Sequence, residues 1–391
     1  MNVLFLNHCL SYGGATKSLI LMEMSLNKDI QIFTAIKKQK KIIPEIRNEF
    51  KFTKEFVEFE IPLIYSHSDG TIQNKDFEKN INFFPNSLIN YINNKKIDIL
   101  HINSTLFPHI LKPIKENTNC KIVVHIREML PDGRRNKVDN FMINNFIQFA
   151  DAIIAITDNE IRHFDYCEKI HIIPNPHNFS ETDKYNTIAN DLNSKLIIGM
   201  CSAFLEIKGH IDFLKTAKII NEVYNNSKTL IEFRIIGYPI YVNSLKEIIK
   251  KIIHFGYKSQ FDRIVKLLKL NNIIIIPYTL DTYKDMSKID IFVRPDLTGN
   301  PWGRDIIEAM AMRKPIVATG TSEFFVKNGE TGFLVPVNDP YKMAEKIILL
   351  INNTELRIKM GTKSYEIIKN KCDLNLYSEK ILNIYKKILT F

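Results

Sequence analysis

Short apolar runs of strand length, separated by amphipathic or polar segments, are the feature of this sequence that most constrains its fold. Val3–Leu6, for example, is followed by a Gly-Gly turn and then by a periodic stretch that we expect to be helical from Ala15 to Leu26. Continuous apolar runs of this length are typical of strands that are buried on both faces of a sheet. The pattern therefore predicts an α/β fold with parallel sheets and helices on both faces.

The same alternation continues along the chain. In the first half we expect strands at Ile97–Ile102, Lys121–His125 and Ala152–Ile156, and helices at Asn82–Asn93 and Asn140–Phe149. In the second half the expected strands are Lys195–Cys201, Glu232–Ile236, Ile273–Ile276, Ile289–Arg294, Ile316–Ala318 and Phe333–Pro336. The helices expected between them are His210–Tyr224, Phe261–Leu268, Thr282–Ser287 and Arg304–Met312. No repeat of solenoid period is visible.

A polar, turn-rich stretch near residues 174–195 predicts a domain boundary. Each side is long enough for one Rossmann-like unit of about 180 residues. We therefore expect one domain over 1–180, a second over 181–370, and a last helix over 371–391 that packs back on the first. Two such units facing each other leave a cleft at the carboxyl ends of their strands, where open α/β sheets bind ligands.

Composition narrows the classes of function. Lys and Arg number 53 against 43 Asp and Glu, a formal charge of +10 that suits a nucleotide, a phosphorylated lipid, an anionic membrane face or a nucleic acid. A Lys-rich sequence bias explains the charge equally well. Aromatic and basic residues are not interleaved as in nucleic-acid binding proteins, so we expect no nucleic-acid partner. The five scattered cysteines include no Cys-x-x-Cys pair, which argues against a disulfide framework and a zinc site.

No signal peptide or membrane-spanning stretch is visible in the sequence. The start lacks a basic region, and nowhere do about 18 apolar residues run together. With reduced thiols, this predicts a cytoplasmic protein.

The segment from Asn300 to Gly320 carries the most functional information. A turn with Pro301 and Gly303 is expected to open a helix whose free N–H groups suit phosphate. Arg304 and Glu308 lie four residues apart on one helical face. A carboxylate one helical turn beyond a phosphate site could accept hydrogen bonds from the two hydroxyls of a ribose. A plain i,i+4 salt bridge on a surface helix is the alternative.

This segment resembles the C-terminal signature of retaining GT-B glycosyltransferases of the large family-4 group. The shared features are a Gly after an aromatic residue, Glu-Ala-Met-Ala, Lys-Pro and Val-Ala-Thr, and further on the turn Gly329–Gly332 and the Asp339-Pro340 helix start. The resemblance implies a GT-B fold, with two Rossmann-like domains whose parallel sheets face each other across a cleft. It also implies transfer of a sugar from a nucleotide-sugar to an acceptor hydroxyl with retention. The family is common in bacterial surface polysaccharide and lipopolysaccharide synthesis.

One residue of the family's Glu-x7-Glu pair differs here. Glu308 matches the second Glu, which implies that it binds the donor ribose. The first Glu contacts the donor sugar in the family, and Asn300 stands in its place. An amide still donates and accepts hydrogen bonds, but it carries no charge. We therefore expect Asn300 to orient the sugar without electrostatic help.

The family's cation pair for the donor pyrophosphate is also incomplete. Lys208 matches the Lys of that pair, whereas Ala203 stands where the Arg usually is. Arg304 or the loop of Arg127 is expected to supply the missing charge. A solvated loop lysine is the alternative for Lys208.

In the N-terminal half, the resemblance implies that the Gly13-Gly14 turn lies under the donor phosphates and near the acceptor. His125 ends an expected strand, and the family often has a His there, near the donor sugar. His101 is the second choice, and His8 stays undecided between a structural and an acceptor-side role. For each of these, a structural role is the alternative.

Pro277 and Tyr278 occupy the family position that contacts the nucleotide base, although an ordinary strand–loop junction explains them equally well. The predicted catalytic residues are His125, Asn300 and Lys208. The predicted donor-binding residues are Gly13, Gly14, Lys208, Pro277, Tyr278, Asn300, Trp302, Gly303, Arg304 and Glu308.

The sequence thus predicts a metal-independent glycosyltransferase without a cofactor, whose co-substrate is a nucleotide-sugar of unknown base. The expected acceptor is a glycan or a lipid-linked glycan. The basic clusters Lys37–Lys41 and Arg134-Arg135 leave open a peripheral contact with an anionic membrane at its inner face, or are simply solvated. The rival hypothesis is a non-catalytic sugar-nucleotide or carbohydrate-binding protein on the same fold, which Asn300 and Ala203 favour.

Overall fold

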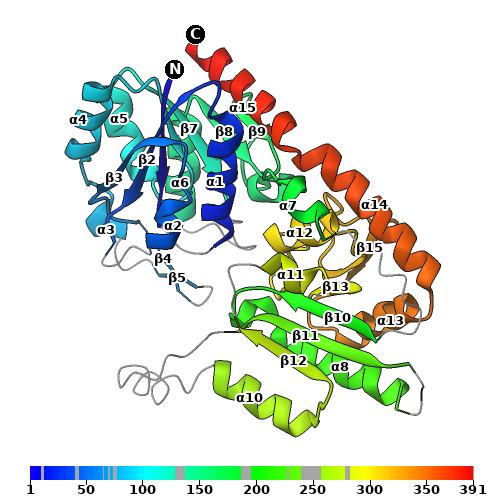
Figure 1. Cartoon of the computed structure of the whole chain (residues 1–391). Helices are drawn as coiled ribbons and strands as arrows, with labels where there is room; N and C mark the ends of the chain where they lie inside the picture. Colours follow the sequence, from blue (N-terminus) through cyan, green and yellow to red (C-terminus); the bar gives the residue numbers. More distant parts are fainter. Residues whose placement is uncertain are drawn as a thin grey trace. The chain divides into compact units, whose positions relative to one another are not determined.

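The computed structural model contains two compact units, which Figure 1 shows with their elements labelled. Unit 1 comprises Met1–His177 and Cys372–Phe391, and unit 2 comprises Asn178–Lys371. The structure describes residues 1–9, 13–39, 44–64, 66–68, 71–73, 77–127, 137–185, 195–225, 227, 229–238, 257–277 and 282–390.

Unit 1 is built on a seven-stranded parallel sheet in the order β3-β2-β1-β6-β7-β8-β9. Its strands are β1 (Asn2–Asn7), β2 (Gln31–Lys37), β3 (Thr53–Phe59), β6 (Ile99–Ile102), β7 (Lys121–Ile126), β8 (Ala152–Ala155) and β9 (Ile170–Ile172). A separate antiparallel pair joins β4 (Ser66–Ser68) and β5 (Thr71–Gln73). The strand order reverses between β1 and β6, and such switch points are where doubly wound sheets bind ligands.

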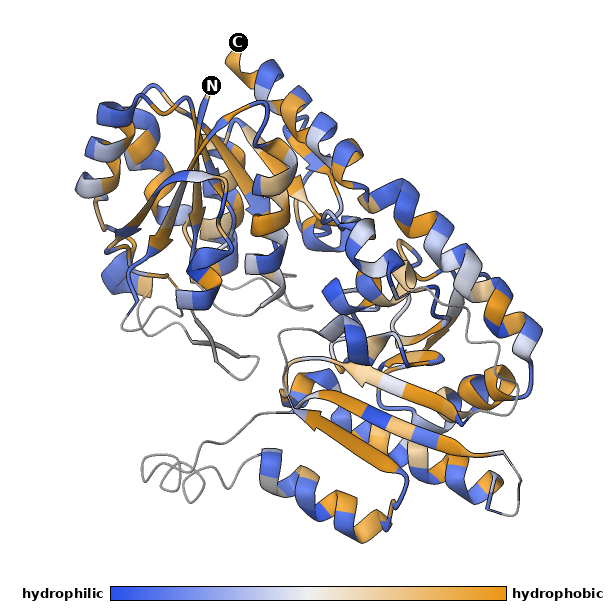
Figure 2. Ribbon diagram, in the orientation of Figure 1, coloured by the Kyte–Doolittle hydropathy of each residue, from blue (hydrophilic) through white to orange (hydrophobic). Residues whose placement is uncertain are grey.

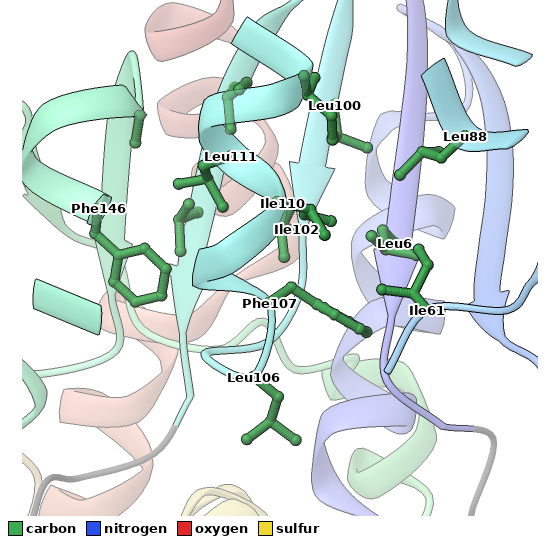
Figure 3. Close-up of a cluster of buried hydrophobic side chains, with 14 of the residues drawn as sticks. Leu6, Ile61, Leu88, Leu100, Ile102, Leu106, Phe107, Ile110, Leu111 and Phe146 are labelled. Atoms are coloured by element: carbon green, nitrogen blue, oxygen red, sulfur yellow. The ribbon is translucent and has the colours of Figure 1, made fainter. Parts of the chain in front are cut away.

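Two apolar clusters cover the two faces of this sheet because alternate residues of β1 point to opposite sides. Leu4 and Leu6 belong to the cluster under the helices α4, α5 and α6, part of which Figure 3 shows. Val3 and Phe5 belong to the cluster under α1 and α15. In the part of unit 1 that the structure describes, the helices are α1 (Gly14–Leu26), α2 (Pro44–Asn48), α3 (Phe77–Asn80), α4 (Asn86–Lys95), α5 (Leu111–Asn117), α6 (Lys137–Phe149) and α15 (Leu374–Leu389), with 3-10 turns η2 (Pro108–Ile110) and η3 (Asp158–Ile161).

Unit 2 has a six-stranded parallel sheet in the order β12-β11-β10-β13-β14-β15. Its strands are β10 (Leu196–Cys201), β11 (Ile231–Tyr238), β12 (Ile273–Pro277), β13 (Ile291–Arg294), β14 (Ile316–Thr319) and β15 (Gly332–Val335). Here the order reverses between β10 and β13. The helices among its described residues are α7 (Phe179–Asp183), α8 (His210–Val223), α10 (Tyr257–Leu268), α11 (Thr282–Met286), α12 (Arg304–Ala311), α13 (Pro340–Ile351) and α14 (Thr354–Cys372), with the 3-10 turn η4 (Glu206–Lys208).

The hydropathy of the elements explains this arrangement. In Figure 2 the strands are mostly hydrophobic, whereas the helices mix hydrophobic and hydrophilic residues. Strands that are apolar on both faces need cover on both faces, which amphipathic helices provide. The predicted α/β class with parallel sheets is therefore confirmed. No helix in the described part of the chain is long and apolar enough to cross a bilayer.

Candidate functional site

Two loops of unit 2 meet at its switch point. One follows β10 and ends in η4, and the other follows β13 and leads into α12. They are joined by a hydrogen bond from the Leu297 N–H to the Ile207 carbonyl, 2.8 Å long. Gly209 has a φ of +70°, and a Cβ there would lie 1.8 Å from the Pro295 carbonyl oxygen. Glycine favours this conformation, and a residue with a Cβ does not fit this approach, so Gly209 is a local condition for the meeting of the two loops.

Lys208 is tied to the second loop by an ion pair. Its Nζ donates to Oδ2 of Asp296 at 2.8 Å, and the Asp296 side chain is only 1% exposed. The other carboxylate oxygen accepts the Thr298 N–H at 3.0 Å. Burial opposes ionisation of Asp296, but Arg294 and Lys208 outweigh it and hold its pKa below the ordinary value. Asp296 is therefore a buried carboxylate that stays charged.

Arg294, the last residue of β13, holds the turn before α12. Its Nη1 donates to both carboxylate oxygens of Asp305 at 2.6 Å, and its Nε donates to the Asn300 carbonyl at 3.0 Å. Its Nη2 reaches Oδ2 of Asp296 at 3.1 Å. A Cβ on Gly303 would lie 2.8 Å from Nη1, so the turn passes directly over the guanidinium. Although burial lowers the pKa of Arg294, the two carboxylates raise it above its ordinary value.

Glu308 lies one turn inside α12 and is only 4% exposed. Its Oε1 is 3.3 Å from Nε of Arg304 and 3.4 Å from the hydroxyl of Tyr283 on α11. Burial and the Glu308 charge raise the pKa of Tyr283, so its hydroxyl stays protonated and can donate. The i,i+4 salt bridge that the sequence suggested is present, but it is buried rather than on a helix surface.

Asn300 and Trp302 shape the turn itself. Oδ1 of Asn300 accepts the Trp302 N–H at 3.3 Å. Trp302 is 6% exposed, and its indole packs on Phe325, with 6.0 Å between the ring centroids. Pro277 is exposed at the end of β12, and Tyr278 lies outside the described residues.

The strand ends of unit 1 bring together a buried polar cluster. His125 on β7 is fully buried, and its Nδ1 is 3.4 Å from Nε2 of His101 on β6. Nδ1 of His101 lies 2.5 Å from the hydroxyl of Tyr385 on α15. Burial, with Arg127 nearby, lowers the pKa of His101 to about 3. Burial, Arg127 and His101 lower the pKa of His125 well below 6.5, so neither ring is charged at neutral pH.

Arg127 is held by amide side chains at the switch point of unit 1. Its Nε donates to Oδ1 of Asn103 at 2.9 Å, and its Nη1 donates to Oδ1 of Asn175. Nδ2 of Asn103 in turn donates to Oδ1 of Asn7 at 3.1 Å. Gly13 precedes α1 and its carbonyl accepts the Lys17 N–H.

The structure thus brings one group of predicted site residues together in unit 2. These are Lys208, Asn300, Trp302, Gly303, Arg304 and Glu308. Gly13, Gly14 and His125 belong to unit 1. Lys40, Lys41, Arg134 and Arg135 lie outside the described residues. Among the described residues, no His, Cys, Asp and Glu side chains group in a way that could hold a metal ion. The roles assigned to all these residues stay predictions.

Sequence reasoning missed Arg294, Asp296 and Asp305, which connect the others. One signal pointed to them: Arg294 is a charged residue that ends the apolar strand Ile-Phe-Val-Arg. A charge at the end of a buried strand needs a nearby partner, and two Asp residues follow within eleven positions.

Residues 183–367 match the family model described as glycosyl transferases group 1. The chain is 28% identical over 209 residues to the capsular polysaccharide biosynthesis glycosyltransferase CapM of Staphylococcus aureus, covering 53% of this chain and 49% of CapM. It is 24% identical over 322 residues to a poly(ribitol-phosphate) alpha-N-acetylglucosaminyltransferase of Staphylococcus aureus strain COL, covering 80% of this chain and 60% of the relative. The chain thus spans less than two thirds of the length of these two relatives.

The structure is similar to that of Anabaena Alr3699/HepE in complex with UDP, with a TM-score of 0.75, 16% sequence identity, and coverage of 99% of this chain and 100% of that one. At this low sequence identity, the similarity shows only that the two proteins share a fold. The fold class predicted from the sequence, GT-B with two Rossmann-like domains, is confirmed.

Proposed function

We propose that this chain, whose residues 183–367 match the glycosyl transferases group 1, is a glycosyltransferase of GT-B fold. It would move a sugar from a nucleotide-sugar to an acceptor hydroxyl with retention, as in the family-4 group. The observation that carries the proposal is the network of charged side chains at the switch point of unit 2. Lys208 there shares Asp296 with Arg294, which also holds the turn before α12.

The chemistry of this group suits a nucleoside diphosphate. The ammonium of Lys208 and the positive end of the α12 dipole would stabilise the charge of the leaving diphosphate. Glu308 would accept the ribose hydroxyls, and Asn300 would orient the sugar. In this proposal the reaction needs neither a metal ion nor a cofactor.

The acceptor in this proposal is a glycan or a lipid-linked glycan of a bacterial surface polysaccharide or lipopolysaccharide. Support comes from the names of the two Staphylococcus aureus relatives, one in capsular polysaccharide synthesis and one acting on poly(ribitol-phosphate). The charge of +10 suits an enzyme that works in the cytoplasm and touches the anionic inner face of a membrane.

A non-catalytic sugar-nucleotide or carbohydrate-binding protein is the second candidate. Two observations favour it: Ala203 provides no cation, and Oδ1 of Asn300 already accepts the Trp302 N–H.

A thermal-shift screen with UDP-, GDP-, ADP- and CMP-sugars tests the proposal. A donor at a hundred times its dissociation constant should add about 2.7 kcal/mol of stability. The best ligand is then incubated without acceptor, and slow release of its nucleotide supports the enzyme. Binding without any release, also when acceptor glycans are added, supports the second candidate. No stabilisation by any of the four classes contradicts the enzyme and the sugar-nucleotide form of the second candidate.

A further inference from the structure

Three cations around the unit 2 switch point are each paired with a carboxylate. Lys208 pairs with Asp296 at 2.8 Å, Arg294 with Asp305 at 2.6 Å, and Arg304 with Glu308 at 3.3 Å. The charges of these three pairs cancel. A diphosphate that binds to one of these cations therefore competes with its carboxylate.

Lys208 is the cation that can be drawn away. Its side chain is 25% exposed, whereas the side chains of Arg294 and Arg304 are 8% and 9% exposed. Arg294 also makes two hydrogen bonds to Asp305 and one to a backbone carbonyl, which hold its guanidinium in place.

Asp296 keeps its other partners when Lys208 leaves. Its Oδ2 still accepts from Arg294 at 3.1 Å, and its Oδ1 still accepts the Thr298 N–H at 3.0 Å. A buried carboxylate that loses all its partners destabilises the protein, but Asp296 keeps these two. The network can therefore exist in two states that differ in the partner of Lys208.

We propose that Asp296 is a positioning residue that competes with the donor diphosphate for Lys208. In the empty site it holds the ammonium of Lys208, and on donor binding the ammonium passes to the phosphate. After transfer, Asp296 takes Lys208 back and so speeds release of the nucleoside diphosphate. This inference rests on the proposed function, since it needs a nucleotide-sugar donor.

The test compares the dissociation constants of UDP and GDP by calorimetry in four variants. Asp296→Asn removes the competitor, and we expect UDP or GDP to bind about two- to fivefold tighter, the range of a partly exposed ion pair. Glu345→Gln removes the same charge from an exposed carboxylate of unit 2 that pairs with Lys342 and Lys346, and it should leave affinity unchanged. Lys208→Ala should weaken binding, and adding Asp296→Asn to it should have no further effect.

A tighter complex is the informative readout, because a substitution that only damages the loop weakens binding. Equal or weaker binding by folded Asp296→Asn, with Lys208→Ala still weakened, overturns the inference and leaves the proposed function standing. If Lys208→Ala binds as the parent does, the inference and the phosphate role of Lys208 both fail. If the parent binds neither nucleotide, the inference falls together with the proposed donor.

Asp296→Ser serves as a second variant where Asp296→Asn does not fold. A measurement on the parent protein needs no substitution at all. With aspartate labelled at 13Cγ, the pKa of Asp296 should rise when the nucleotide binds, because one of the two neighbouring cations has left it. A pKa that stays the same in the saturated complex overturns the exchange.

Discussion

At the scale of single residues, Glu308 offers the most direct test of the donor site. Glu308→Ala should weaken the binding free energy of UDP by about 1.5–3 kcal/mol, because a charge-assisted hydrogen bond to a ribose hydroxyl is lost. Calorimetry with UDP measures this. The nucleotide lacking both ribose hydroxyls is the control, and it should bind parent and variant alike. Equal affinity of parent and variant for UDP would contradict the ribose assignment.

A variant at Asn300 can distinguish donor binding from the transfer reaction. Asn300→Ala removes the amide expected to orient the donor sugar, but it leaves the carbonyl that accepts from Arg294. We expect lower turnover at saturating donor, by about tenfold for one neutral hydrogen bond, and nearly the same affinity for UDP. Steady-state rates with calorimetry decide this. Parent-like turnover would mean that the sugar is held elsewhere.

At the scale of elements, the meeting of two loops at Gly209 can be tested with a matched pair of glycines. Gly209→Ala should lower the free energy of unfolding by more than about 2 kcal/mol and weaken UDP binding, because both φ and the Pro295 carbonyl oppose a Cβ. Gly329 has a φ of +81°, and a Cβ at this position would have no atom within 4 Å. Gly329→Ala should therefore cost only the conformational term of about 1 kcal/mol.

Urea unfolding of both variants measures the difference. If Gly209→Ala is no less stable than Gly329→Ala, the close approach to Pro295 does not matter for the loop.

The sequence pattern locates the elements that are apolar throughout. The strands β1, β7, β8, β10 and β14 lie within two residues of their expected bounds. The pattern does not reveal β3 or β9. Both are edge strands, so one side of each is not covered by a neighbour, and four of the seven residues of β3, Thr-Lys-Glu-Phe-Val-Glu-Phe, are polar. It also misses β2, whose buried run includes Thr34 and follows α1 after only four residues.

Within the candidate site, motif and spacing predict single loop and helix positions, but not the contacts between them. Lys208, the turn at Gly303 and the helix position of Glu308 can be predicted from motif and spacing. The Lys208–Asp296 link cannot, because it depends on β10 and β13 becoming neighbours across about 90 residues of sequence. The Arg294–Asp305 link depends on the conformation of the loop between β13 and α12. The sequence also did not show that the Arg304–Glu308 pair is buried, because the contact with Tyr283 comes from another element, α11.

At the scale of the whole molecule, buried Glu23 makes stability depend on pH. Burial raises its pKa to about 8, although a hydrogen bond from Thr34 partly opposes this. The folded state therefore keeps a proton that the unfolded state loses above about pH 4.5. The stability from this group is fully present below that pH and is lost as the pH rises toward 8.

Glu23→Gln should remove this dependence. The parent should lose up to about 1.4 kcal/mol per pH unit relative to the variant between about pH 5 and 8. Urea unfolding at several pH values gives the difference between the two proteins. The comparison cancels the opposite effect of the buried histidines, whose lowered pKa values cost stability as the pH falls below 6.5. Parallel curves would show that Glu23 ionises in the folded protein.

The chain leaves unit 1 after His177 and returns at Cys372, where the His177 N–H donates to the Cys372 carbonyl at 2.7 Å. Unit 2 is thus inserted into unit 1, and Tyr377 and Tyr385 of α15 fill the core of unit 1. During translation, the first unit cannot close its core until α15 has left the ribosome, after all of unit 2 has been made. A chain that stops early therefore keeps an open hydrophobic face on unit 1, which quality-control proteases and chaperones can detect.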